Sequence, residues 1–296
     1  MIKIEGFRNI QKVYDGEKTT IYRAVKDEGN LPVIIKHPSN EYFDLTVVEK
    51  LKHEFEISKK IQSNRCVKIY EFEYLNNIPV LLIEDFGGIS LKHAVCSAEL
   101  SLSGLIRLAI SITEGIIDIH KSGVVHNDIN PGNIIVSKDF EVVKITDYGI
   151  SSLINKEGRA LQGTNTFMGT LRYISPEQTG RINRFVDRRS DFYSLGVTLY
   201  ELMAGKHPYD AEGDLELIHA HLAQIAVPLC EVNKDIPEAV SNIVMKLLEK
   251  EPENRYQSAK GLLCDLKKAY SQLDETGKIE NFELGKDDIA DVFILI

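Results

Sequence analysis

Three features common in other protein classes are scarce or missing in this chain of 296 residues. Its four cysteines stand far apart with no CxxC pair, so neither a disulfide framework nor a zinc knuckle is predicted. Lys and Arg number 35 against 44 Asp and Glu, a net charge of -9, which argues against a surface for nucleic-acid phosphates. No apolar run approaches the roughly 20 residues of a membrane span, and the N-terminus has no signal-like apolar core. We therefore expect a soluble, cytoplasmic protein with no nucleic-acid partner and no membrane span.

The pattern of apolar residues changes near residue 87. Before that point, short apolar stretches alternate with turns, which predicts five strands. Between the third and fourth strands, residues 45–62 carry apolar side chains at helical spacing. After the Gly-Gly pair at 87–88, long periodic segments such as 102–123 and 190–205 predict helices that end at glycine.

These patterns predict an α+β protein of two lobes. The first lobe, over 1–86, is expected to be a five-stranded antiparallel sheet with one main helix, and the second, over 87–275, to be mainly helical. The two lobes would join near residues 84–88 and leave a cleft between them. Residues 276–296 are acidic and rich in turns, which predicts a C-terminal tail or linker.

A polar turn interrupts two apolar runs in the stretch VVHNDINPGNIIV at 124–136. His126, Asn127, Asp128 and Asn130 crowd this turn, and Asn133 leads into the second apolar run. Asn133 follows Asp128 by five positions, and a DYG tripeptide begins fourteen positions after Asn133, at Asp147. So many polar groups between two buried segments indicate a functional loop.

This series resembles the H-R-D-x-x-x-x-N loop and the D-F-G motif of eukaryotic-type serine/threonine protein kinases. Upstream, VIIK ends in Lys36, which is similar to the third-strand lysine of the family, and Glu54 follows 18 positions later. Downstream, SPE at 175–177 resembles A-P-E, and Arg255 stands where the family has a late arginine that pairs with the A-P-E glutamate.

A longer segment, 169–205, resembles the N-terminal kinase-like domain of very large bacterial and fungal signalling proteins. In those proteins an AAA-type ATPase region and a sensor histidine kinase follow the domain. The resemblance implies a protein substrate, and it points to the histidine kinase or ATPase region of a longer chain as a partner.

The family resemblance implies a bilobal protein-kinase-like fold and ATP- and Mg²⁺-dependent phosphoryl transfer to Ser or Thr hydroxyls of a protein in signalling. Asp128 would be the base, and Asn133 and Asp147 would hold Mg²⁺. Lys36, braced by Glu54, would fix the nucleotide phosphates. Asn130 and Thr170 complete the predicted set of catalytic residues. The predicted nucleotide-binding residues are Gly16, Ile21, Ile34, Lys36, Ile83, Glu84, Phe86 and Ile135, with the carbonyl of Glu84 and the N–H of Phe86 facing adenine.

The chain departs from the family pattern at four places. Asn127 replaces the arginine that in many relatives captures an activation-loop phosphate, so control by that route is not expected. Asn130 replaces a lysine that supports the transferring phosphoryl group, which predicts slow turnover. Only Gly16 remains of three loop glycines, and Tyr148 replaces the phenylalanine of D-F-G with a hydroxyl that needs a partner.

Simpler explanations stand beside the functional ones. Lys36 could be a solvated strand end, Glu56 is a rival partner for it, and the isoleucines of the nucleotide-binding set could serve packing alone. His126 is expected to position its loop by hydrogen bonding, and His219 and His221 to be solvated residues without a joint metal site.

Two other functions compete with protein phosphorylation. A pseudokinase would bind nucleotide or a partner without efficient transfer, which the single loop glycine and Asn130 favour. A small-molecule kinase of the same fold is disfavoured by the SPEQ element at 175–178 and by the long segment before it.

Overall fold

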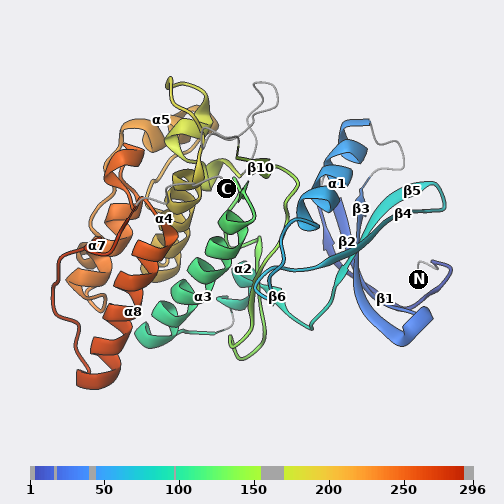
Figure 1. Cartoon of the computed structure of the whole chain (residues 1–296), viewed down its shortest axis with the longest axis horizontal. Helices are drawn as coiled ribbons and strands as arrows, with labels where there is room; N and C mark the ends of the chain where they lie inside the picture. Colours follow the sequence, from blue (N-terminus) through green and yellow to red (C-terminus); the bar gives the residue numbers. More distant parts are fainter. Residues whose placement is uncertain (1–3, 17–18, 40–44, 97, 155–169, 290–296) are drawn as a thin grey trace, which may run out of the picture.

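The structure is a computed structural model that describes residues 4–16, 19–39, 45–96, 98–154 and 170–289. Figure 1 shows two lobes, one built on a sheet and one mainly helical, connected by the chain that follows β5. The bilobal α+β fold predicted from the sequence is confirmed. No helix in these described ranges is both long and apolar enough to span a membrane.

The small lobe is a five-stranded antiparallel sheet in the order β1-β2-β3-β5-β4. Its elements are β1 (Phe7–Asp15), β2 (Thr19–Lys26), a short 3-10 turn (Glu28–Asn30), β3 (Leu31–Pro38), α1 (Leu45–Ser58), β4 (Ile69–Leu75) and β5 (Ile78–Glu84). Strand side chains alternate between two apolar clusters. Val33 and Ile35 of β3 lie in one cluster, and Leu81 of β5 packs with Leu51 of α1 in the other. The helix is shorter than predicted, because it ends at Ser58.

The large lobe combines three long helices with shorter elements. Its helices are α2 (Leu91–Ala94), α3 (Leu102–Lys121), α4 (Arg188–Ala204), α5 (Asp214–Ala223), α6 (Leu229–Val232), α7 (Glu238–Leu247) and α8 (Ala259–Thr276), with 3-10 turns at Leu171–Tyr173, Pro176–Thr179 and Pro252–Asn254. Its strands are β6 (Ile89–Ser90), β7 (Val124–Val125), β8 (Ile134–Val136), β9 (Val143–Ile145) and β10 (Ser152–Leu153). They form a β6-β8-β9 sheet and a β7-β10 pair.

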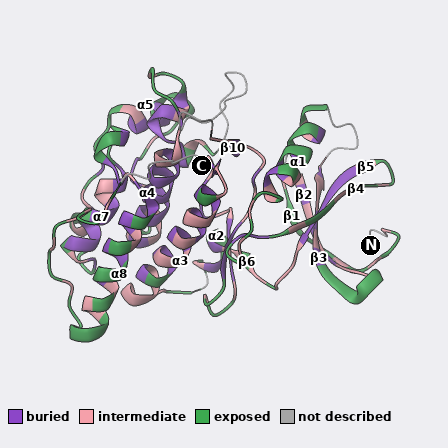
Figure 2. Ribbon diagram, viewed as in Figure 1, coloured by how far each residue is buried: buried purple, intermediate pink, exposed green. Residues whose placement is uncertain are grey.

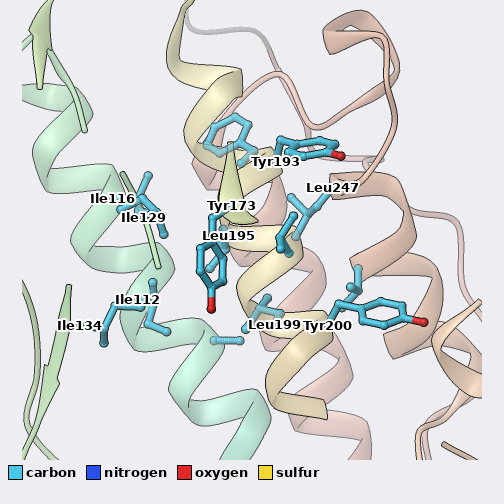
Figure 3. Packing of buried hydrophobic residues seen from close by; sticks show 14 of the residues in the cluster. Ile112, Ile116, Ile129, Ile134, Tyr173, Tyr193, Leu195, Leu199, Tyr200 and Leu247 are labelled. Carbon is cyan, nitrogen blue, oxygen red and sulfur yellow. The ribbon is translucent and has the colours of Figure 1, made fainter. Parts of the chain in front are cut away.

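Helix α4 is the centre of the large lobe. Every residue from Ser190 to Tyr200 is buried, as Figure 2 shows by colour along this helix. Such burial on all sides requires apolar partners all around the helix. Ile112 and Ile116 of α3 lie on one side of Leu195 and Leu199, and Leu247 of α7 lies on the other (Figure 3).

The segment after α8 folds back onto the large lobe. Gly277, at φ +71°, ends the helix in the left-handed conformation that glycine adopts without strain. Further on, Oδ1 of Asp288 accepts hydrogen bonds from the backbone N–H and the hydroxyl of Ser258, both at 2.8 Å. Asp288 therefore helps Ser258 cap the start of α8.

A buried polar cluster lies between α4, α5 and the turn at Pro252. His221 is fully buried and its Nδ1 lies 3.1 Å from the hydroxyl of Tyr193, so the expectation that it is solvated is wrong, whereas His219 is exposed. Its partners come from distant segments, which a local pattern does not reveal. Nζ of Lys250 also donates to this cluster, to the hydroxyls of Tyr193 at 3.2 Å and Tyr209 at 2.8 Å.

Lys250 has no carboxylate among these hydrogen-bond partners, and burial lowers its pKa from 10.5 to about 7. The charged guanidinium of Arg255 acts in the same direction. Burial also lowers the pKa of His221 to about 3 and raises that of Tyr209 to about 12, so both stay neutral near pH 7. Lys250 is therefore the group of this cluster that titrates near neutrality.

This pKa makes stability depend on pH in one direction. Between pH 7 and 10.5 the unfolded chain binds a proton that the folded chain lacks, so the free energy of unfolding rises with pH by up to about 1.4 kcal/mol per unit. We expect Lys250→Met to remove this rise, as measured by urea denaturation at several pH values. Lys234→Met, at an exposed lysine, is the control and keeps the wild-type slope. Parallel profiles for wild type and Lys250→Met would contradict the assignment.

Candidate active site

Lys36 of β3 is the centre of an ion-pair group where the two lobes meet. Its Nζ lies 2.8 Å from Oε2 of Glu54 on α1 and 3.1 Å from Oδ1 of Asp147, which follows β9 in the large lobe. Only 11% of the Lys36 side chain and 2% of the Glu54 side chain are exposed, so the lysine is no solvated strand end. The rival Glu56 points elsewhere and pairs with Lys59 in solvent.

The charges of this group shift one another's pKa. Burial alone would lower the pKa of Lys36, but the carboxylates of Asp147 and Glu54 outweigh it and raise the value. Burial would raise the pKa of Asp147, and the ammonium of Lys36 instead holds it below the ordinary value. Burial raises the pKa of Glu54 to about 7. The ammonium of Lys36 is therefore in contact with an ionised Asp147 from the other lobe.

Asp191 of α4 fixes the loop between β7 and β8 through hydrogen bonds to its backbone. Its carboxylate accepts hydrogen bonds from the backbone N–H of His126 at 2.9 Å and of Asn127 at 2.8 Å. Asn127 has φ +68°, a conformation that asparagine tolerates better than most residues. The ring of His126 lies 3.0 Å from the carbonyl of Thr146, so it joins this loop to the chain before Asp147.

Asp128 stands at the end of this fixed loop with both carboxylate oxygens engaged. Oδ2 accepts from Nδ2 of Asn133 at 2.9 Å, and Oδ1 accepts from the backbone N–H of Thr170 at 2.9 Å. Asn130 donates to the carbonyl of Asp128 at 3.0 Å and lies 3.5 Å from the Thr170 hydroxyl. All four residues therefore meet, and Thr170 reaches Asp128 through its backbone.

The donor set beside Asp128 fits a hard divalent cation. Asn133 uses its Nδ2 on Asp128, which leaves its amide oxygen as the other polar atom, and Asp147 supplies a carboxylate. Mg²⁺ prefers oxygen ligands and shares substrate phosphates, so two protein groups suffice. Among the residues described, no three Asp, Glu, His or Cys side chains form a protein-only metal site.

Four of the predicted nucleotide-binding residues pack in one apolar cluster. Ile34, Ile83, Phe86 and Ile135 belong to one apolar cluster that joins the sheet to β8. They are therefore packed together, as the explanation by packing requires, and Ile21 is paired with Lys36 in the β2-β3 register.

Gly16 lies in the turn after β1. Its N–H donates to the carbonyl of Thr19 at 3.0 Å, and its carbonyl accepts from the hydroxyl of Ser39 at 2.5 Å. A side chain on Gly16 would meet the Tyr14 ring at 2.6 Å. One backbone and one side-chain hydrogen bond thus fix Gly16.

The connection between the lobes carries two ion pairs that no sequence motif indicated. Oε1 of Glu84 lies 2.6 Å from Nζ of Lys144 on β9, and Oδ2 of Asp85 lies 2.7 Å from Nε of Arg23 on β2. Both depend on contacts between distant segments, so local spacing holds no signal for them.

Neutral hydrogen bonds occupy the position of the missing arginine. Nδ2 of Asn127 donates to the carbonyl of Ile150 at 3.0 Å and to the hydroxyl of Ser152 at 2.9 Å. The carbonyl of Asn127 accepts from Nε2 of Gln178 at 2.8 Å. Asn127 is uncharged, and it links the residues that follow Asp147 to the turn that contains Glu177. The hydroxyl of Tyr148 donates to the carbonyl of Ile145 at 2.9 Å, so it is satisfied.

Comparison with known proteins gives the same family as the geometry. The family model described as "Protein kinase domain" matches residues 7–265. A probable serine/threonine-protein kinase of Clostridium acetobutylicum is 35% identical over 253 residues, which cover 85% of this chain and 38% of that protein. A second, of Clostridium perfringens, is 30% identical over 88% of this chain and 37% of its own length. A probable serine/threonine-protein kinase PknB of Lactococcus lactis is 28% identical over 97% and 44%.

The chain thus spans less than half the length of each of these three relatives. The residues matched by the family model, 7–265, include elements of both lobes. On this evidence the chain belongs to the eukaryotic-type protein kinase domain family.

Proposed function

We propose that the chain transfers the γ-phosphoryl group of ATP to Ser or Thr hydroxyls of a protein, with Mg²⁺, in cytoplasmic signalling. The observation that carries this proposal is the contact of Lys36 from the small lobe with Asp147 from the large lobe, at 3.1 Å. Phosphoryl transfer depends on positioning and charge stabilisation more than on covalent chemistry, and this contact places opposite charges where the two lobes meet.

Each residue of the group has a distinct task in this proposal. Asp128 orients the substrate hydroxyl and takes its proton, and Lys36 fixes the nucleotide phosphates. Asn133 and Asp147 hold Mg²⁺, which neutralises charge on those phosphates when bound. Asn130 cannot supply the cation that a lysine would, which supports slow turnover.

The surroundings of the domain are also proposed. We infer the divisions 1–86, 87–275 and 276–296 for the small lobe, the large lobe and a tail or linker. The resemblance of 169–205 to signalling proteins supports a histidine kinase or ATPase region of a longer chain as the partner or substrate region.

A transfer assay on the wild-type protein tests the proposal against a nucleotide-binding pseudokinase. We expect radiolabel from ATP to appear on phosphoserine or phosphothreonine of the chain or of an added protein, only with Mg²⁺. ATP and Mg²⁺ should also raise the melting temperature, because a ligand that binds only the folded state stabilises it. Stabilisation without any transfer would establish the pseudokinase instead.

A further inference from the structure

Arg23 of β2 reaches from the sheet to the connection between the lobes. It stands two positions after Ile21, so both side chains lie on the same face of the strand. This face is opposite to Tyr22 and Ala24, which are buried in the cluster of the outer sheet face. Besides its 2.7 Å contact with Asp85, Arg23 donates from Nη2 to the carbonyl of Gly88 at 2.8 Å.

The contacts of Arg23 and Asp85 involve two glycines, whose backbones have little conformational preference of their own. Oδ1 of Asp85 accepts from the N–H of Gly87 at 2.8 Å, and only 7% of the Asp85 side chain is exposed. Gly87 has φ +80°, and a Cβ on Gly88 would lie 2.6 Å from the Phe86 ring. Glycine can adopt many backbone conformations, so the conformation of Gly87 and Gly88 depends on their contacts with other residues.

These contacts bear on nucleotide binding because of where they lie in the chain. Asp85 stands between Glu84 and Phe86, whose backbone groups are the proposed partners of adenine. Gly88 immediately precedes β6, which pairs with β8 of the large lobe. Arg23 therefore connects β2 both to the middle of the peptide proposed to bind adenine, at Asp85, and to its end, at Gly88.

We propose that Arg23 is a positioning residue for the nucleotide: through Asp85 and Gly88 it holds the peptides of the hinge, residues 84–88, in the conformation that adenine requires. This inference rests on the proposed function, since it assumes a nucleotide in the cleft. It assigns Arg23 no contact with the phosphates or the transferred group.

The first test compares adenosine with ADP as ligands in calorimetric titrations of Arg23→Met. A displaced hinge weakens both ligands by the same factor, about three- to tenfold, because both bind it through the same base. A distorted phosphate loop weakens ADP alone. Lys26→Met, on the same strand as Arg23, removes a pair with Glu71 of β4; it is the control and leaves both affinities unchanged.

A second variant separates the effect of the Arg23–Asp85 ion pair from that of the hydrogen bond between Asp85 and Gly87. Asp85→Asn retains an oxygen for the N–H of Gly87 but loses the charge that attracts Arg23. We expect it to weaken both ligands as Arg23→Met does. The double variant should bind no more weakly than the weaker single one, because the contact that Asp85→Asn weakens is already lost in Arg23→Met. Amide hydrogen exchange at Gly87 and Gly88 should be faster in Arg23→Met and unchanged in Lys26→Met.

The outcomes distinguish this inference from the proposed function. Unchanged affinity for both ligands in Arg23→Met, or weakening of ADP alone, overturns the positioning role even if the wild type transfers phosphate. A wild type that binds ADP without transferring phosphate overturns the proposed function and leaves the hinge test intact. A wild type that binds neither ligand overturns both. If Arg23→Met does not fold, the near-isosteric Asp85→Asn decides by the same criteria.

Discussion

We expect Asp147→Asn to lower the rate of phosphoryl transfer at least about a thousandfold. The substitution removes the carboxylate that faces Lys36 at 3.1 Å and that, in our proposal, holds the metal with Asn133. An amide carries no charge, so it neither retains the cation well nor balances the ammonium of Lys36. Lys36 keeps its second partner, Glu54, and the ion pair inside the small lobe survives.

Asparagine is a better replacement than alanine at this position. Asp147 has φ +69°, in the left-handed region where Asn and Asp are tolerated and a Cβ without a polar group is strained. Alanine would therefore combine a backbone cost, on the order of 1 kcal/mol, with the loss of the carboxylate.

The measurement is radiolabel transfer from ATP at saturating Mg²⁺, with the melting temperature recorded for each variant. Asp147→Asn should melt close to the wild type, and Asp147→Ala should melt lower. Asp274→Asn, at an exposed carboxylate of α8, is the matched control and should transfer at the wild-type rate. Transfer by Asp147→Asn at a rate similar to the wild type would contradict the role given to Asp147.

Much of the fold was predictable because its signals are local. Strand alternation and helical periodicity identified the five strands of the small lobe and the helices α3 and α4. The spacing of motif residues also indicated which side chains meet, as for Lys36 and Glu54. Spacing works here because each motif residue lies on or next to an element whose direction the pattern predicts.

Other features depend on three-dimensional contacts that leave no local trace. Arg23 and Asp85 are 62 positions apart, and nothing near either residue marks them as partners. His221 is buried only because polar groups from several distant segments enclose it. The approach of Thr170 to Asp128 through a backbone N–H is equally invisible, since every residue except proline has that donor. Tertiary packing determines all three.

Arg255 and Glu177 form the most completely buried ion pair among the salt bridges described. The guanidinium donates to both Glu177 oxygens, at 2.7 and 2.9 Å, and the exposed fractions of the two side chains are 0% and 1%. Its remaining N–H groups donate to the carbonyls of Arg189, Glu249 and Lys250. Burial would raise the pKa of Glu177, but Arg255 holds it below the ordinary value. The carboxylate is therefore charged although it is buried.

We expect Arg255→Met to lower the free energy of unfolding by about 3 to 5 kcal/mol, because it leaves the buried carboxylate of Glu177 without an opposite charge. The total stability of a typical domain is only about 5 to 15 kcal/mol, so this is a large fraction. Replacing both partners, as in Glu177→Leu with Arg255→Met, should cost less than Arg255→Met alone, since no unpaired charge remains. Urea denaturation of the three proteins measures this difference.

A surface ion pair provides the comparison that interprets the result. Arg184 pairs with Glu251 and Glu253, but 37% of its side chain is exposed, so Arg184→Met should cost no more than about 1 kcal/mol. Glu177 lies in the Pro176–Thr179 turn, and Ser190, which donates to it at 2.7 Å, adjoins the loop anchor Asp191. The loss of Arg255 should therefore loosen the loop of Asp128 and reduce transfer before the protein unfolds. Equal costs for Arg255→Met and Arg184→Met would show instead that water reaches the buried pair.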